Sequence, residues 1–346
     1  MPRPHDGAEA TLSRRGHLPL RPTPRARRAG APRRPRHGAG LLAAALLATL
    51  AFARAGAAEP LAPRLLVWGF QSGEVLSVPR GIAFDPRDGA IVVANTGRHR
   101  VETYSHTGRP LARFVHRVTR PDSTVVDGEP CALAFDRSGR LLVADQLALY
   151  VDVLDRRGRP VARLDVPGGH PAALAVGPDG TIYVGTTAEE SKVHRFRPDY
   201  APDGTWGEPG GAAGHLFDVT ALAVLGDSAV AVACARTDVG VQVFTPAGVY
   251  LRGFGSREMG RGNLSLPSGL AATADGRIWV CDEIRGDLQA FDAQGNFLEV
   301  AASRGEGAGD LMHPSSLAYD GRGRFAVTER SLGRFQVLAQ PDVPGR

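Results

Sequence analysis

The sequence predicts an all-β fold, a six-bladed β-propeller, and a repeated pattern is the main reason. After residue 78, one unit recurs six times: a strand rich in small residues, an Asp/Gly turn, and an apolar strand ending in valine. The valines are 50, 41, 48, 48 and 47 residues apart, and they are Val93, Val143, Val184, Val232, Val280 and Val327. A period in the forties with about four short strands per unit is typical of propeller blades.

The strand that follows each turn is apolar at nearly every position, as in residues 91–93 and 278–280. A half-exposed strand would alternate between apolar and polar residues. Continuous apolarity indicates a strand covered on both faces. A blade packed between two neighbouring blades meets this condition.

The third strand of each unit differs, because a polar residue holds its second place in all six copies. These residues are Glu102, Asp152, His194, Gln242, Gln289 and Gln336. We therefore expect this strand to lie farther from the propeller axis and to be partly in contact with water.

The sixth unit ends after its third strand, so its outer strand must come from elsewhere. Residues 64–70 near the N-terminus resemble the outer strand that ends in Gly253 and Phe254. We predict that residues 64–70 pair with residues 334–339 and close the ring. Closure of this kind hides the strand edges that an open sheet would expose.

Residues 1–57 are predicted to be a cleaved signal peptide, and residues 58–346 the propeller. The leader combines an unusually long Arg- and Pro-rich region, a short apolar run over residues 41–52, and an A-x-A cleavage signal before Ala58. We therefore expect export to the periplasm or the extracellular space, by either the general or the twin-arginine route. The mature chain has no expected transmembrane anchor.

The mature chain carries no excess of positive charge. The leader holds 11 of the 41 basic residues and two of the 36 acidic ones, which leaves 30 basic and 34 acidic residues and a net charge of −4. This balance argues against nucleic acid as the partner. Three cysteines, Cys131, Cys234 and Cys281, fall inside predicted strands, where buried free thiols are expected; a Cys234–Cys281 disulfide across a blade interface is the alternative.

The units resemble NHL repeats. The resemblance rests on residues 255–282 (GSREMGRGNLSLPSGLAATADGRIWVCD) and 304–329 (RGEGAGDLMHPSSLAYDGRGRFAVTE), which contain a glycine-rich linker, a proline, Leu-Ala, an Asp-Gly turn and a final valine followed by an acidic residue. It implies a propeller scaffold whose members range over peptide-processing lyases, protein-binding platforms and RNA-binding modules. Function must therefore be argued from the site itself.

One row of candidate residues precedes the inner strands and should gather at the top face of the ring. We define the top face as the one where inner strands begin and second strands end. His170 and His313 oppose each other across the ring, and some propeller lyases of this type are similar in placing channel histidines on zinc. A zinc site takes three or four ligands, so Glu129 and Asp218 would complete it. The alternative is that each His-Pro pair is a turn element; Arg80 is the expected ligand-facing cation.

A second row of candidates ends the second strands. It consists of Asn95, Asp145, Thr186, Cys234, Asp282 and Glu329. Short polar side chains at such places commonly cap the following turn. A ring of carboxylates can also hold Ca²⁺, which takes six to eight oxygens. Both interpretations remain open, with the turn role favoured.

The sequence contains none of the common nucleophile or metalloprotease motifs, such as G-x-S-x-G or H-E-x-x-H. We therefore expect a monomeric binding platform that engages a protein, peptide or glycan through its top face. The ligand-binding candidates are Arg80, Asn95, Glu129, Asp145, His170, Asp218, Asp282, His313 and Glu329. The alternatives are a metal-dependent lyase or hydrolase resembling peptidyl-hydroxyglycine lyase, with zinc on His170 and His313, or a calcium-dependent enzyme resembling lactonases.

Overall fold

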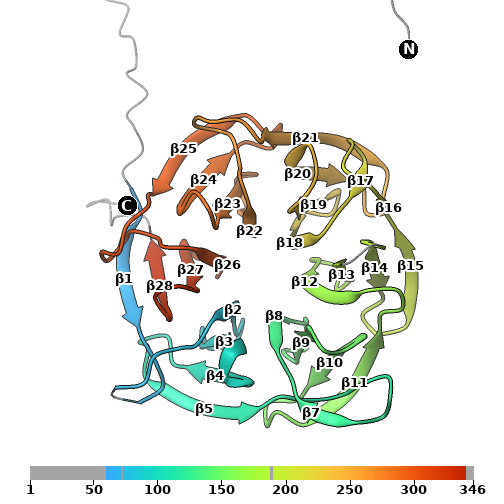
Figure 1. Ribbon diagram of the computed structural model, residues 1–346, viewed down its shortest axis with the longest axis vertical. Coiled ribbons are helices and arrows are strands. Elements are labelled where there is room, and N and C mark those ends of the chain that lie inside the picture. The colour runs from blue at the N-terminus through green and yellow to red at the C-terminus, as the bar shows by residue number, and fades with distance from the viewer. Residues whose placement is uncertain (1–59, 72, 188–189, 340–346) are drawn as a thin grey trace, which may run out of the picture. The chain divides into compact units, whose positions relative to one another are not determined.

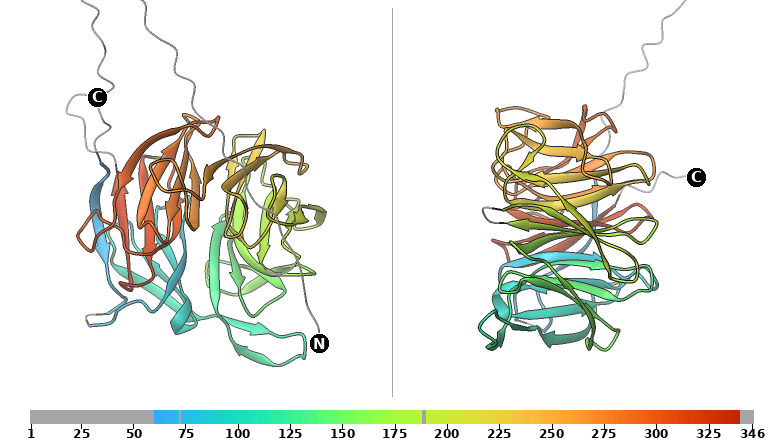
Figure 2. Two further views of the ribbon diagram at one scale, coloured as in Figure 1. Left: turned by 45° about the horizontal axis from the view of Figure 1, so that its top comes forward. Right: turned by 90° about the vertical axis from the view of Figure 1, so that its right-hand side faces the viewer.

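The computed structural model describes residues 60–71, 73–187 and 190–339. Six four-stranded antiparallel sheets surround a common centre (Figure 1), and the right-hand view of Figure 2 shows them edge-on. The predicted all-β six-bladed propeller is confirmed. The predicted signal peptide and its boundary at residue 57 lie outside the described residues.

Blades 1 to 3 each contain four strands, ordered from the innermost strand outward. They are β2 (Pro79–Phe84), β3 (Ile91–Asn95), β4 (Arg100–Tyr104) and β5 (Pro110–Val115); β8 (Pro130–Phe135), β9 (Leu141–Asp145), β10 (Tyr150–Leu154) and β11 (Pro160–Asp165); and β12 (His170–Val176), β13 (Ile182–Thr187), β14 (Val193–Phe196) and β15 (Pro202–Trp206).

Blades 4 to 6 repeat the arrangement. They are β18 (Val219–Leu225), β19 (Ala229–Cys234), β20 (Val239–Phe244) and β21 (Tyr250–Ser256); β22 (Pro267–Ala272), β23 (Ile278–Asp282), β24 (Asp287–Phe291) and β25 (Phe297–Ala302); and β26 (Pro314–Tyr319), β27 (Arg324–Glu329), β28 (Arg334–Ala339) and β1 (Ala62–Val67). The shorter elements are η1 (Thr96–Arg98), within blade 1, and four strands in the linkers between blades: β6 (Arg117–Thr119), β7 (Val125–Asp127), β16 (Glu208–Pro209) and β17 (His215–Leu216).

The inner strands contact one another in sequence around the ring, and β26 returns to β2. In the last blade, β1 pairs antiparallel with β28, with Leu66 opposite Gln336. The observed strand covers residues 62–67, two residues earlier than the segment 64–70 expected from the sequence. The first and last described segments of the propeller therefore share one sheet (Figure 1).

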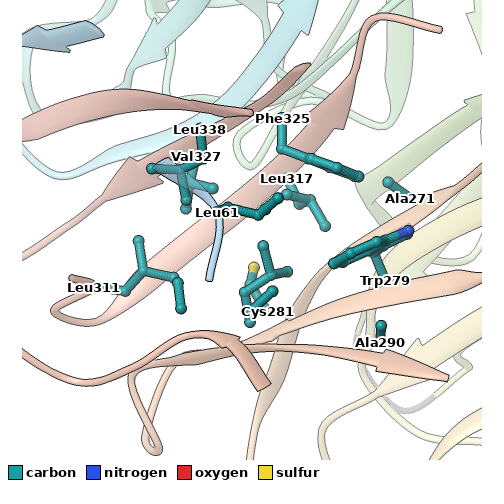
Figure 3. Close-up of a cluster of buried hydrophobic side chains, with 13 residues drawn as sticks. Leu61, Ala271, Trp279, Cys281, Ala290, Leu311, Leu317, Phe325, Val327 and Leu338 are labelled. Carbon is teal, nitrogen blue, oxygen red and sulfur yellow. The ribbon is translucent and has the colours of Figure 1, made fainter. Parts of the chain in front are cut away.

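The core lies between the blades. Every residue of β3, β9 and β23 is buried, which confirms that the second strands are covered on both faces. Between blades 5 and 6, Trp279 and Phe325 stack with ring centroids 4.6 Å apart, and Cys281 and Leu317 fill the space beside them (Figure 3).

The expectation that the third strands are partly wet is wrong. Their polar residues are all at most 5% exposed, and most of them bind the linker that precedes the blade or other buried groups. Gln289, for example, accepts a hydrogen bond from Gly262 N at 2.9 Å and donates one to Asn263 O at 3.1 Å. Gln242 and Gln336 hold their linkers in the same way. A buried backbone amide needs such a partner.

The three cysteines are free and buried, as the first interpretation expected. Burial raises the pKa of their thiols, to about 12 for Cys131 and Cys281. Cys131 also has a polar role, since its Sγ lies 3.3 Å from the carbonyl oxygen of Pro171 in the next blade. Within the described parts of the chain, no helix has the length and apolar character needed to cross a lipid bilayer.

Candidate functional site

A cavity of about 420 Å³ opens where the inner strands meet. The inner strand of each blade contributes one leucine or isoleucine to its lining, at the same position of the repeat. This aliphatic ring consists of Ile82, Leu133, Leu174, Leu222, Leu270 and Leu317. The size falls within the range of small-molecule sites, which are about 300–1,000 Å³.

Six polar side chains of the lining lie at the starts of inner strands or at and just after the ends of second strands, at the top face. We call this group the polar rim; it consists of Arg80, Gln146, His170, Thr187, Glu283 and Arg330. The hydroxyl residues Thr220, Ser268, Ser315 and Ser316 also line the cavity. Two residues of the polar rim, Arg80 and His170, were expected from the sequence.

The backbone places Arg80 on the rim through a β-bulge. In every blade, the pairing of the inner with the second strand shifts near the start of the inner strand, in five blades directly after the first pair, for example between Pro79 and Ile82. A bulge leaves one residue unpaired and re-aims its side chain. In blade 1 the residue after the first pair is Arg80, so its guanidinium is presented to the cavity.

In four other blades, the residue at this position binds the neighbouring blade. Ser268 donates to Pro314 O and Ser315 donates to Pro79 O, each at 2.6 Å. Thr220 and Cys131 make the corresponding contacts. Arg80 does not, and Thr96 instead donates to Pro130 O at 2.7 Å. Blade 1 thus keeps the contact between blades while releasing Arg80 for the cavity.

Arg80 is oriented by Gln146. With the amide oxygen of Gln146 turned toward it, that oxygen accepts from Arg80 Nε at 3.2 Å and from Nη1 at 2.8 Å. Among the described residues, no carboxylate lies within ion-pair distance of Arg80. The second guanidinium of the rim, that of Arg330, forms an ion pair with Glu283 from the adjacent blade.

His170 also lies on the rim, where its Nδ1 is 3.3 Å from the carbonyl oxygen of Ala148. A carbonyl only accepts, so Nδ1 carries the proton in the neutral ring and Nε2 keeps its lone pair. His313 is not part of the cavity lining, and its Nδ1 lies 2.5 Å from Ser331 Oγ. The structure therefore brings only His170 of the two histidines to the cavity.

The remaining residues of the first row also lie away from the lining. Asp218 pairs with Arg236 at 2.8 Å, and Glu129 is half-buried and is not part of the lining. Val78, Asp218 and His313, each just before an inner strand, have φ of 48°, 53° and 50°. Such left-handed conformations are uncommon for residues other than glycine, and they mark the repeated turn that enters the inner strand.

The second row is buried and does not line the cavity. Asp282 accepts hydrogen bonds from four backbone N–H groups, those of Ser265, Leu266, Ile284 and Arg285. Three further members of the row bind the protein's own backbone or side chains in related ways: Asn95, Asp145 and Glu329. These groups fasten each linker to the turn after the second strand, which is the turn role that the sequence favoured.

The donor set fits neither zinc nor calcium. Among the described residues, no three His, Cys, Asp or Glu side chains gather as a metal site requires. For zinc, only His170 of the four expected ligands lines the cavity. For calcium, the second-row oxygens already accept hydrogen bonds from the protein.

Four rim residues were missed from the sequence: Gln146, Thr187, Glu283 and Arg330. Each directly follows a member of the second row, namely Asp145, Thr186, Asp282 and Glu329. The landmark residue is the buried one, and the residue after it faces the cavity. These residues could have been predicted by taking the position after each second-row residue, since neighbouring residues of an extended chain point to opposite sides.

Comparisons with known proteins agree with this architecture. The family model "NHL repeat" matches residues 76–104, which begin just before blade 1. The chain is a six-bladed β-propeller. The matched stretch spans one repeat unit, and it agrees with the resemblance to NHL repeats seen in the sequence. No curated protein matches the chain.

Solved structures resemble the chain in fold. A gluconolactonase from Xanthomonas campestris is 16% identical, with a TM-score of 0.59, and the alignment covers 82% of this chain and 95% of that one. A virginiamycin B lyase from Staphylococcus aureus is 13% identical, with a TM-score of 0.57 and coverage of 80% and 99%. A protein of unknown function from Bacteroides thetaiotaomicron is 18% identical, with a TM-score of 0.57 and coverage of 78% and 71%.

Proposed function

We propose that this protein is an exported binding platform that engages a protein, peptide or glycan ligand at the mouth of its central cavity. The polar rim is the observation that carries the proposal. It combines an oriented guanidinium without a carboxylate partner among the described residues, an ion pair, an amide, a hydroxyl and an imidazole around one opening. Convergent polar groups around a partly apolar cavity are typical of binding sites.

Apolar side chains on the same face support a partner larger than the cavity. Val75, Val78, Met259 and Ile284 are 50%, 41%, 91% and 54% exposed. All four lie in segments that enter inner strands or leave second strands, so the topology puts them at the top face. Exposed apolar residues beside a polar opening favour contact with a macromolecule.

Export is part of the proposal. An exported protein would lose residues 1–57 and begin at Ala58. N-terminal sequencing of the protein recovered from the periplasm or medium of an expressing bacterium tests this point. Light scattering on the same material tests the expected monomer.

One observation favours an enzyme as the second candidate. His170 lines the cavity with a defined tautomer, which makes Nε2 available as a base or a metal ligand. The gluconolactonase and the virginiamycin B lyase share the fold, and their activities give the assays to try. Elemental analysis of residues 58–346 and of the His170→Ala, His313→Ala variant tests the metal-dependent form. Near-stoichiometric zinc that disappears in the variant would favour the enzyme.

The binding proposal is tested by capture on immobilised protein, with a peptide library and a glycan array as probes. We expect ligands of the wild type to be lost when Arg80, His170 and His313 are changed together to Ala. Arg157→Gln, in the exposed turn between β10 and β11 at the opposite end of the blades, is the control and should keep them. If every interaction survives in the triple variant, the assignment to the top face is wrong.

A further inference from the structure

We propose that the cavity binds a carboxylate group attached to a small apolar moiety, with Arg80 holding the carboxylate and the aliphatic ring holding the apolar part. This inference rests on the proposed function and specifies the chemistry of its ligand. Such a group occurs on a free N-acylated amino acid and at the C-terminus of a peptide.

The charge of the rim favours an anion. Its two guanidiniums, Arg80 and Arg330, face a single carboxylate, that of Glu283, which is already paired with Arg330. One positive charge in the half-buried rim is left without a counter-charge from the described residues. A bound anion would supply it, and charge-assisted hydrogen bonds are stronger than neutral ones.

The geometry of Arg80 suits a carboxylate in particular. Gln146 receives the Nε and Nη1 contacts, and an arginine has five N–H donors. Three donors therefore remain, on a guanidinium whose orientation is fixed by the amide. A planar guanidinium held in place can donate two parallel hydrogen bonds to the two oxygens of a carboxylate.

The position of Arg80 in the repeat adds an independent argument. The equivalent residues Thr220, Ser268 and Ser315 stabilise the ring by binding the next blade. Arg80 departs from this pattern, and Thr96 supplies the missing contact. Local departures of this kind, compensated nearby, are expected at functional sites.

The lower lining favours an apolar moiety. Leu133, Leu222, Leu270 and Leu317 line the cavity while remaining only 5–7% exposed. The hydroxyls of Ser268 and Ser315 are already used by carbonyl groups of neighbouring blades. Below the rim, the aliphatic ring supplies the apolar surface that a ligand can cover, and burial of apolar area there favours binding.

Calorimetric titration with N-acetylleucine and its amide tests the inference. A tetrapeptide ending in leucine, as free acid and as C-terminal amide, separates the free ligand from the peptide terminus. Galacturonate tests whether the apolar moiety is needed. We expect the free acids to bind at least ~10-fold more tightly than the amides, as loss of a charge-assisted pair implies, and galacturonate to bind more weakly than N-acetylleucine.

Variants assign the binding to the rim. Arg80→Gln should weaken acid binding at least ~10-fold, which is the effect expected from loss of a charge-assisted contact. Arg80→Lys should weaken it less, and Glu283→Gln should tighten it because a competing negative charge is removed. Arg157→Gln should change nothing, because its side chain is exposed in the turn between β10 and β11 at the opposite end of the blades. Melting curves of each variant check that the fold is retained.

The inference is overturned if neither acid binds the wild type, if acids and amides bind alike, or if folded Arg80→Gln binds as the wild type does. The proposed function fails separately. If a partner binds the wild type and is lost in the triple variant, but N-acetylleucine neither binds nor competes, the platform stands and the carboxylate assignment falls.

Discussion

Nδ1 of His116 lies 2.8 Å from Oδ2 of Asp145, and both side chains are buried where the first blade connects to the second. Nε2 of the same ring lies 3.3 Å from a carboxylate oxygen of Asp152. The imidazole therefore bridges a second-row residue and a third-strand residue. Burial alone would lower the pKa of His116, but the hydrogen bond to Asp145 and the nearby carboxylate of Asp152 outweigh it and raise the pKa to about 9.

This arrangement predicts a pH-dependent stability. The pKa of His116 is higher in the folded protein than its ordinary value of 6.5, so its contribution is complete below about pH 6.5. It is lost as the pH rises through about 9. We expect the free energy of unfolding to fall between pH 7 and 10 by up to ~3 kcal/mol, measured by urea denaturation.

The matched variant is His116→Asn, which lacks the titrating group. It should be less stable than the wild type at pH 7, and its stability should depend less on pH between 7 and 10. Parallel curves for the two proteins across this range would show that His116 is not charged in the folded state.

The buried glutamine of a third strand is expected to stabilise the linker that it binds. Gln289→Leu would leave Gly262 N and Asn263 O without their partner, so we expect a loss of ~1–3 kcal/mol. Gln294→Leu, in an exposed turn, is the control and should cost less than ~0.5 kcal/mol. Equal urea midpoints for the two variants would contradict the role given to Gln289.

The close approach of blades 5 and 6 at Gly269 makes a second stability prediction. A Cβ at this position would lie 2.5 Å from Leu317 N and 2.7 Å from Cys281 Sγ. Gly269→Ala should therefore force the blades apart and lower the free energy of unfolding by ~1–3 kcal/mol. Gly211→Ala, whose Cβ would meet only Arg236 O at 3.4 Å, is the control and should leave the free energy of unfolding nearly unchanged. Thermal melts of the two variants check both expectations.

Closure of the ring by the N-terminal strand is tested by truncation. A chain that begins at Trp68 lacks β1 and so exposes the edge of β28. In the intact protein, Leu66 of β1 pairs with Gln336 at this edge. Such an edge is a template for pairing with another chain. We expect lower urea midpoints and association detected by light scattering. A truncated chain that stays monomeric and equally stable would show that closure contributes nothing.

Much of the fold follows from the sequence because periodic apolarity reports burial directly. The valine repeat and the fully apolar second strands predict both the number of blades and the location of the core. The exposure of the third strands was predicted wrongly. The side chain of Gln289, for example, is buried and forms hydrogen bonds with the backbone of a linker 26 and 27 residues earlier in the chain, which the repeat pattern does not reveal. Polarity indicates hydrogen bonding, and it does not by itself indicate exposure.

The site was harder to predict because one residue of register decides which side chain meets the cavity. Asp282 and Glu329 stand out in the sequence, yet they serve the backbone, while Glu283 and Arg330 beside them reach the rim. Arg80 could be predicted as a cavity residue because it directly follows Pro79, which marks the start of an inner strand. The hydrogen bonds from Arg80 to Gln146 connect two blades, and no sequence pattern in either repeat predicts them.

The most direct test of the central claim is equilibrium binding of a captured ligand to three proteins compared side by side. These are the wild type, Arg80→Gln and Arg157→Gln. A site at the cavity mouth predicts at least ~10-fold weaker binding for Arg80→Gln, in line with loss of a charge-assisted contact, and unchanged binding for Arg157→Gln. Equal affinity of all three folded proteins would place the binding site elsewhere on the propeller.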